Sequence, residues 1–383
     1  MIEPSSLAQI AQEVRSCVDL DQGILDEMRA EVRPLRPETR RIHPRSATAI
    51  SLVGTDGGNN QLRFDPFMVH LIRVVDSSEN ELCLEAITQN TPLDILNARH
   101  FASDGPTTDG QPKTALGEMM AFLGVKRLQD LSPVFRGRST VSGEPRELAA
   151  SWVAVYREMT EWAVLFSLLR KKDFGTDTVI VRDGFLRSKM FAEKLFGKLR
   201  DGMDAAIQDR YRKSRRRIYL VGIAKHSNVL QIYRLALALE GVMRNPYPCY
   251  LEVPPVMEER AYVWDEYFKR TDKFVAGKMY LVKFGHSPYD PVWAIDLLIS
   301  QTESAPTTLG YLLEDAKDGF PVRLYPQCLQ RAHESAALVD FDMEILEDQI
   351  RDALRESLAE KRTIVDELAF QDRDPASRRY RLT

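Results

Sequence analysis

Cysteine is scarce in this chain of 383 residues, which has only four, at positions 17, 83, 249 and 328. No two of them form a C-x-x-C pair, so a zinc ribbon and a dithiol redox motif are excluded. Long apolar runs are also lacking: none approaches the roughly 18 residues that a membrane-spanning helix needs. Residues 1–20 mix acidic and apolar side chains, unlike a signal peptide. A cytoplasmic protein with no membrane partner is therefore expected.

A large charge of either sign is missing as well. The 52 lysines and arginines nearly balance 56 aspartates and glutamates, which leaves a net charge of −4. This near neutrality gives no long-range attraction for nucleic acid. The G-x-x-x-x-G-K-[ST] and G-x-S-x-G motifs are absent, which excludes a Walker-type nucleotide hydrolase and a serine hydrolase of that type.

Runs of apolar and β-branched residues predict a sheet. The first three, residues 48–56, 66–75 and 81–88, are separated by short turns and predict an antiparallel meander. The first run leads into Gly57 and Gly58, which predict a tight turn at its end. Four later strands, the last two forming a hairpin, are expected at residues 178–184, 217–224, 278–284 and 292–299.

Helices are predicted between and around these strands from apolar residues three and four apart. They cover residues 5–33 (one or two helices), 144–170, 187–199, 228–239, 309–318, 327–338 and 343–368. The order of elements predicts an α/β fold with an RNase H-like mixed sheet, flanking helices, an N-terminal helical segment and C-terminal helices. We expect a helical segment and linker at 1–45, an RNase H-like domain at 46–345 with a surface insertion at about 89–118, and a C-terminal helix and tail at 346–383.

Two of the predicted strands end in an Asp-Gly pair, at Asp56 and at Asp183. An aspartate in this position projects its carboxylate into the crevice beyond the strand ends, where ligands of open α/β sheets bind. Two carboxylates that converge there repel each other unless a cation neutralises them, and oxygen ligands suit Mg²⁺ or Mn²⁺. The alternative is that each pair is only a turn.

Three further acids are candidates for the same site. Glu158 and Glu161 lie on the helix expected before the Asp183 strand, and either can face the sheet edge or the solvent. Asp296 is flanked by apolar residues within a predicted strand. Burying an unpaired carboxylate is costly, so Asp296 is expected to be paired, metal-bound, at an edge or outward-facing.

Basic residues gather at residues 210–217, where Arg210, Arg212, Lys213, Arg215, Arg216 and Arg217 follow one another closely. This cluster predicts either contact with a phosphate backbone or a solvated loop. Lys225 follows a strand, where its ammonium group can meet a phosphate or only solvent. His333 is isolated within a predicted helix, and such a histidine is more often structural or exposed than catalytic.

Together these motifs resemble the NurA nuclease family in type and order, over roughly residues 45–340. The resemblance implies an RNase H-like fold, bound Mn²⁺ with Mg²⁺ as an alternative, and hydrolysis of DNA. It implies that Asp56, Glu161, Asp183 and Asp296 are the metal ligands, with Glu158 as the alternative to Glu161. It places His333 and Lys225 near the scissile phosphate.

The same resemblance implies a homodimer that docks on a HerA-type hexameric ATPase. It implies exonuclease and single-strand endonuclease activity in DNA end processing, repair or anti-phage defence. The expected chemistry is metal-assisted hydrolysis, positioned by phosphate contacts with little sequence preference. Phe185 and the insertion at 89–118 depart from the family pattern.

Two other interpretations remain open. A catalytically inactive adaptor of the same fold could bind the translocase, although a decayed site should have lost at least one acid. An actin-like ATPase or sugar kinase also uses Asp-Gly turns after a meander. That class needs a second phosphate loop and a late adenosine-binding glycine pair, which we do not find.

Overall fold

The computed structural model describes residues 3–46, 50–64, 67–88, 91–102, 110–137, 150–262, 274–337 and 340–357. The chain forms two compact units whose segments alternate along the sequence. Unit 1 comprises residues 1–50, 182–187 and 219–327, and unit 2 comprises residues 51–181, 188–218 and 328–383. In the described residues, no helix is both long enough and apolar enough to cross a membrane.

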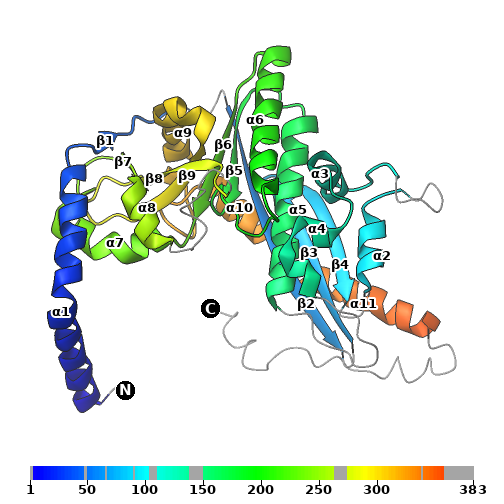
Figure 1. Ribbon diagram of the computed structural model, residues 1–383, viewed down its shortest axis with the longest axis horizontal. Helices are drawn as coiled ribbons and strands as arrows, with labels where there is room; N and C mark the ends of the chain where they lie inside the picture. The colour runs from blue at the N-terminus through cyan, green and yellow to red at the C-terminus, as the bar shows by residue number, and fades with distance from the viewer. Residues whose placement is uncertain are drawn as a thin grey trace. The chain divides into compact units, whose positions relative to one another are not determined.

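Unit 1 packs helices against short strands. Its first helix, α1 (Pro4–Val32), is a single helix that lies beside α7 (Asn228–Leu239) in Figure 1. Their apolar stripes join a buried cluster that includes Tyr233, Leu251 and Met279. The other elements of this unit are η1 (Arg33–Leu35), β1 (Arg40–Arg41), β6 (Ile218–Ala224), β7 (Cys249–Glu252), α8 (Pro255–Ala261), β8 (Gly277–Lys283), β9 (Val292–Leu298), η5 (Ile299–Ser304) and α9 (Ala305–Lys317).

The strands of unit 1 include two that the sequence did not predict. β8 and β9 pair antiparallel, as the predicted hairpin requires. β7 pairs antiparallel with β8 on one side and with β1 on the other. β1 and β7 are too short, at two and four residues, to show the alternation by which a strand is recognised.

Unit 2 contains the predicted meander. β2 (Ile50–Phe64), β3 (Phe67–Asp76) and β4 (Glu81–Thr88) pair antiparallel in sequence order. The predicted tight turn at Gly57 and Gly58 is wrong, because β2 continues through both glycines. They pair with Val74 and Arg73 of β3, so the ladder holds them in extended backbone.

Three helices of unit 2 pack on one another through aromatic rings. They are α3 (Ala115–Leu123), α5 (Ala150–Lys171) and α6 (Leu195–Ser214). The ring centroids of Trp162 and Phe196 are 5.1 Å apart, and those of Phe122 and Phe166 are 4.9 Å apart. The predicted helix at 187–199 is wrong at both ends. The buried apolar residues of α6 continue beyond Leu199 to Ile207. Residues 210–214 are therefore the last turn of this helix and not part of a loop.

The insertion expected at about 89–118 is a packed structure where it is described, and not a bare surface loop. It contains α2 (Leu93–Arg99) and the start of α3, while residues 89–90 and 103–109 lie outside the described residues. His100 is fully buried, with Nε2 3.1 Å from the hydroxyl of Tyr156 on α5 and Nδ1 2.8 Å from Thr114. α4 (Leu128–Leu131) and η3 (Pro133–Gly137) follow.

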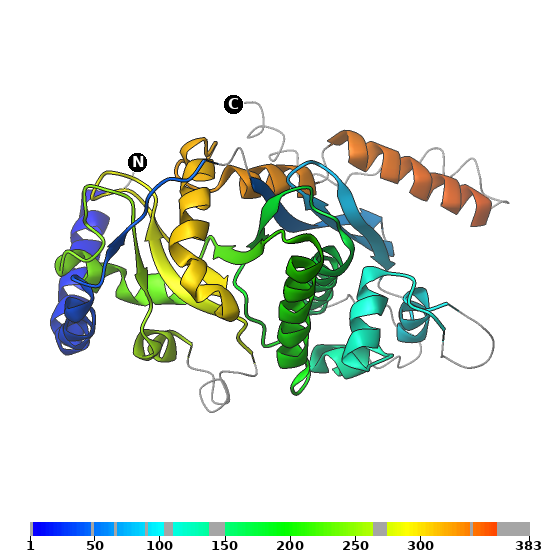
Figure 2. The ribbon, with the colours of Figure 1, turned by 90° about the horizontal axis from the view of Figure 1, so that it is seen from above.

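The remaining elements complete the sheet and cover it. β5 (Asp177–Asp183) is common to both units, which divide between Val181 and Arg182. The strands follow the hydrogen-bonded order β1-β7-β8-β9-β6-β5-β2-β3-β4, with the meander at one edge, as expected of an RNase H-like α/β sheet. α10 (Gln327–Ala336) lies along β2 in Figure 2, and α11 (Asp340–Ser357) packs on Val69 and Leu71 of β3. The rest of the C-terminal helix predicted to Leu368 lies outside the described residues.

The buried histidines predict how stability depends on pH. His70 on β3 is only 3% exposed, and burial lowers its pKa, as it does that of His100. Below the ordinary value of about 6.5, the unfolded chain takes up protons that the folded chain refuses, so stability is lost as the pH falls. In urea denaturation between about pH 7 and 5, His70→Leu should flatten this loss by up to about 1.4 kcal/mol per pH unit.

The control for this measurement is His286→Leu, since His286 is exposed on the turn between β8 and β9. It should leave the pH dependence of the unfolding free energy unchanged. An unchanged slope in His70→Leu as well would show that protonation of this buried ring does not destabilise the fold.

Candidate metal centre

Asp56 lies within β2, on the face that α10 covers. Gly54 and Gly58, two residues to either side, point to the same face because side chains alternate along a strand. A Cβ at Gly54 would lie 2.3 Å from the carbonyl oxygen of Cys328, and a Cβ at Gly58 would lie 2.2 Å from that of Ala336. Only glycine permits this approach of a helix to a strand. The two glycines therefore let α10 lie directly over Asp56.

His333 is the side chain that α10 brings to Asp56. Its Nδ1 lies 2.6 Å from Oδ2 of Asp56, and the ring is 64% exposed. A carboxylate can only accept, so in the neutral ring Nδ1 carries the hydrogen and Nε2 is left for another partner. The other oxygen of Asp56, Oδ1, accepts the backbone N–H of Gly57 at 2.8 Å. The pair is thus fixed by one hydrogen bond on each side of the carboxylate.

Asp183 is the last residue of β5 and is followed by Gly184, whose φ of 109° requires glycine. The Nζ of Lys225, which follows β6, lies 2.8 Å from Oδ2 of Asp183. Asp183 is mostly buried, whereas Lys225 is more exposed. The ammonium group therefore supplies a positive charge at the end of β5.

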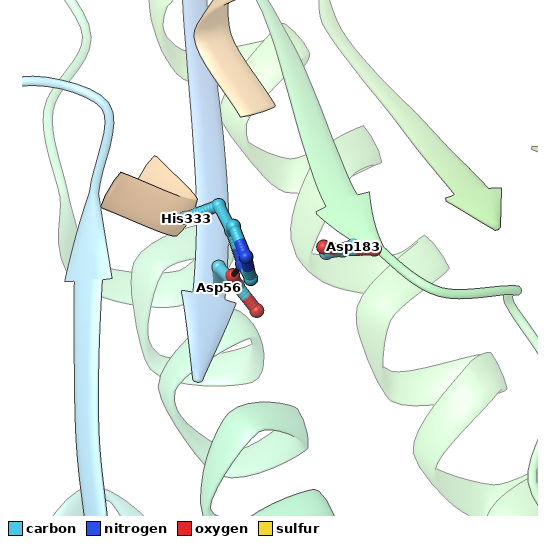
Figure 3. Close-up of side chains that lie close together, drawn as sticks. All are labelled: Asp56, Asp183 and His333. Atoms are coloured by element: carbon cyan, nitrogen blue, oxygen red, sulfur yellow. Dashed lines mark hydrogen bonds and ion pairs between the residues drawn. The ribbon is translucent and has the colours of Figure 1, made fainter. Parts of the chain in front are cut away.

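Asp56, Asp183 and His333 form a group that can hold a cation. Each offers one ligand atom, and these atoms lie within 4.8 Å of one another. Figure 3 shows the imidazole of His333 beside the carboxylate of Asp56, with Asp183 at the end of β5. Two carboxylates and an imidazole are a donor set that divalent transition-metal ions, Mn²⁺ among them, accept.

The two glutamates expected on the helix before β5 have different surroundings. The Oε1 of Glu158 accepts the hydroxyl hydrogen of Ser188 at 2.5 Å. Glu161 instead reaches β2: a Cβ at Gly57 would lie 2.3 Å from its Oε1, which is also 3.3 Å from Nε of Arg157. Gly57 points to the face opposite Asp56, so Glu161 approaches β2 from the other side and is not part of the three-residue group. Its role as a ligand stays a prediction.

Asp296 is in a buried ion pair and is not part of the group either. Its side chain is fully buried on β9, where Oδ1 accepts from Nη2 of Arg187 at 2.6 Å and Oδ2 accepts from Nε at 2.9 Å. Oδ2 also accepts the backbone N–H of Leu186 at 3.0 Å. Arg187 is buried too and donates to Glu258 at 2.8 Å. Both oxygens of Asp296 are engaged, which favours a structural role over metal ligation.

The sequence predicted a paired Asp296 as one of several possibilities, but it did not identify the partner. An aspartate inside an apolar strand requires a buried cation, and arginine makes two parallel hydrogen bonds to a carboxylate. Arg187 lies four residues after Asp183, where we predicted the start of a helix, so it was not recognised as the partner of Asp296.

The basic residues 210–217 are only partly available for DNA. Lys213 pairs with Asp209 at 2.6 Å, and Arg216 pairs with Asp173 at 3.2 Å. Arg215 and Arg217 each lie 5.9 Å from the ring centroid of Tyr211. Arg210, Arg212, Lys213, Arg215, Arg216 and Arg217 remain a predicted DNA contact.

Replacing Asp296 distinguishes the two roles proposed for it. Asp296→Asn leaves the buried guanidinium of Arg187 with Glu258 as its carboxylate partner and should lower the unfolding free energy by about 3 kcal/mol. Its affinity for Mn²⁺, measured by calorimetry at a temperature where the variant is folded, should equal that of the wild type. Asp318→Asn, an exposed position, is the control and should change stability by less than about 0.5 kcal/mol. A stable Asp296→Asn protein with weakened Mn²⁺ binding would restore the metal-ligand role.

Comparisons with known proteins give matches among solved structures alone, since no family model and no curated protein matches the chain. The crystal structure of the NurA nuclease from Sulfolobus solfataricus is 12% identical, with a TM-score of 0.41 over 93% of this chain and 98% of that chain. A second NurA structure is 10% identical, with a TM-score of 0.43 over 91% and 98%. A structure of NurA bound to dAMP and manganese is 13% identical, with a TM-score of 0.37 over 88% and 94%. The family that the sequence motifs resemble is thus also the family of these similar structures.

Proposed function

We propose that this chain is a metal-dependent nuclease of the NurA type that hydrolyses phosphodiester bonds in DNA. The observation that carries the proposal is the group of Asp56, Asp183 and His333, whose ligand atoms lie within 4.8 Å of one another. Lys225, beside Asp183, adds a cation of the kind that stabilises a phosphate. In the hydrolysis of a phosphodiester, the carboxylate pair would bind the metal ion and the neighbouring ammonium group would stabilise negative charge on the phosphate.

The donor set favours Mn²⁺ over Mg²⁺. Mg²⁺ prefers oxygen ligands and keeps much of its water, whereas an imidazole nitrogen is a better ligand for transition metals. Asp56 would serve twice, since each carboxylate oxygen has two lone pairs. It holds the imidazole of His333 through Oδ2, and Oδ1, which accepts the backbone N–H of Gly57, has a second lone pair that could bind the cation.

The chemistry follows from these placements. A bound divalent cation lowers the pKa of a water molecule and stabilises charge on the phosphate. Asp56 fixes the ring orientation of His333, so that Nε2 is presented in one direction. If Asp183 held a divalent cation, that cation would neutralise the carboxylate, and the ammonium group of Lys225 would be available to a phosphate oxygen. Glu161, against Gly57, is proposed as a further acid near the site.

The finer parts of the proposal rest on the resemblance of the sequence to the NurA family. They are exonuclease and single-strand endonuclease action, a homodimer, a HerA-type ATPase as partner, and a cytoplasmic role in DNA end processing, repair or anti-phage defence. Residues 210–217 are proposed to contact the DNA backbone, chiefly through charges not already paired with Asp173 and Asp209.

Loss of the two carboxylates tests the site. Asp56→Ala and Asp183→Ala should each lower Mn²⁺-dependent digestion of linear DNA by more than about 100-fold, since even the outer partners of a metal ligand account for about 10- to 100-fold. Asp318→Asn is the matched control and should digest DNA as the wild type does. Full activity in both alanine variants would overturn the site. A wild type that is inert with every divalent metal, even with its ATPase partner present, would favour the inactive adaptor.

Lys225→Met separates metal binding from catalysis. Removing the ammonium group frees Asp183 from a competing cation, so the affinity for Mn²⁺ should rise by about fivefold, the equivalent of roughly 1 kcal/mol. Cleavage at saturating Mn²⁺ should fall by at least about tenfold, because the charge that offsets the phosphate is lost. Calorimetry and gel-based digestion give the two values, with Lys317→Met as the control for an exposed lysine. Weaker Mn²⁺ binding in Lys225→Met would contradict the competition.

A further inference from the structure

Unit 1 contains a groove of about 470 Å³ that the proposed chemistry does not use. It lies between the end of β6, α7 with the segment that follows it, and the turn between β8 and β9. Its volume is within the range of about 300–1,000 Å³ that is usual for ligand sites. The lining residues that carry the argument are Lys225, Arg234, Arg244, Tyr289, Asp290 and Trp293.

The charge of this groove is positive, unlike that of the whole chain. Lys225, Arg234 and Arg244 face a single carboxylate, that of Asp290. In the described part of the chain, neither Arg234 nor Arg244 has an acidic side chain within ion-pair distance, and both are exposed. The carboxylate of Asp290 is partly satisfied within its own turn, where it accepts the backbone N–H of Ser287 at 2.7 Å. Two guanidinium groups are thus available to an anion.

An exposed aromatic ring accompanies these guanidinium groups. Tyr289 is 84% exposed, and the guanidinium carbon of Arg244 lies 5.6 Å from its ring centroid. Arginine covers one face of the ring at most, which leaves the other face for a planar ligand. An aromatic face with adjacent arginines is the combination by which proteins bind single-stranded nucleic acid, since bases stack and phosphates pair with the cations.

A buried lysine fixes the two sides of the groove relative to each other. Lys283 on β8 is fully buried, and its ammonium group donates to the carbonyl of Ser287 at 3.0 Å and to that of Asn245. Asn245 follows Arg244, and Ser287 lies two residues before Tyr289. The segment with Arg244 and the turn with Tyr289 are therefore held together before any ligand arrives, which lowers the entropy cost of binding.

The groove reaches Asp183, one of the proposed metal ligands, through Lys225. Lys225 lines it and also pairs with Asp183, and both residues belong to unit 1. A strand whose phosphate lies at Lys225 would have the next part of its backbone within the groove.

We propose that this groove binds single-stranded DNA, with a base stacked on Tyr289 and phosphates on Arg234 and Arg244, beside the bond that is cut. The proposal rests on the proposed nuclease function for its choice of ligand. A duplex presents no free base face, so Tyr289 distinguishes single strands from paired ones.

Fluorescence anisotropy with a labelled oligothymidylate in EDTA tests the groove without cleavage. Tyr289→Ala should weaken binding by about 5- to 100-fold, and Tyr289→Phe should bind as the wild type does. Arg244→Ala should weaken binding and reduce the salt slope of log K by about 1. Phe320→Ala, which removes another exposed aromatic ring of unit 1, should have no effect.

The results of these binding measurements test the proposed DNA-binding groove independently of the proposed nuclease activity. No binding by the wild type at low salt, or equal binding by Tyr289→Ala and Phe320→Ala, would overturn the groove even if DNA is digested in Mn²⁺. An equal loss of affinity for a blunt duplex in Tyr289→Ala would overturn base stacking. Groove-dependent binding by a wild type that never cuts DNA would support the groove and contradict the nuclease.

Discussion

The buried ion pair between Asp296 and Arg187 determines where the end of β5 lies. Arg187 is four residues from Asp183, and Asp296 also accepts the backbone N–H of Leu186. The chain that leaves β5 is therefore fastened to β9 by three hydrogen bonds to one carboxylate. Such a pair is weak evidence for stability, because burying two charges is costly. Its effect is positional: it holds the residues after Asp183 against β9, while the backbone N–H of Gly184 donates to Ile223 of β6 at 2.7 Å.

A second constraint, within unit 2, is steric and not electrostatic. Gly54 and Gly58 remove the two side chains that would keep α10 away from β2. The backbone of the helix then comes close enough for His333 to reach Asp56. An acid in the middle of a strand thereby acquires a partner that lies hundreds of residues later in the sequence. Neither contact, the ion pair after β5 in unit 1 or the close packing of α10 on β2 in unit 2, is visible as a motif in the sequence.

The sequence predicted the strands and helices that show a periodic pattern of apolar residues. It did not predict the contacts between segments that are distant in the sequence. The meander, the β8–β9 hairpin and the long helices followed from alternation and apolar stripes. The glycines at 57 and 58 were interpreted as a turn because local propensity favours one, whereas pairing with β3 and packing against Glu161 decide their conformation. At the candidate site, the expectation that both aspartates end a strand holds for Asp183 but is wrong for Asp56, which lies within β2. The engagement of Asp296 by Arg187 and the pairing of His333 with Asp56 could not be predicted, since both depend on how separate segments meet.

The exposure of His333 would affect how fast the candidate metal centre exchanges a bound cation. One of the three candidate ligands lies on the outer surface of α10, with most of its ring in water. A cation held there is reached by solvent and by chelators without any opening of the fold. Exchange with the surroundings should then be rapid, and occupancy would follow the concentration of free metal instead of being set once during folding. The cleavage of DNA that we propose would then depend on the concentration of free Mn²⁺ around the protein.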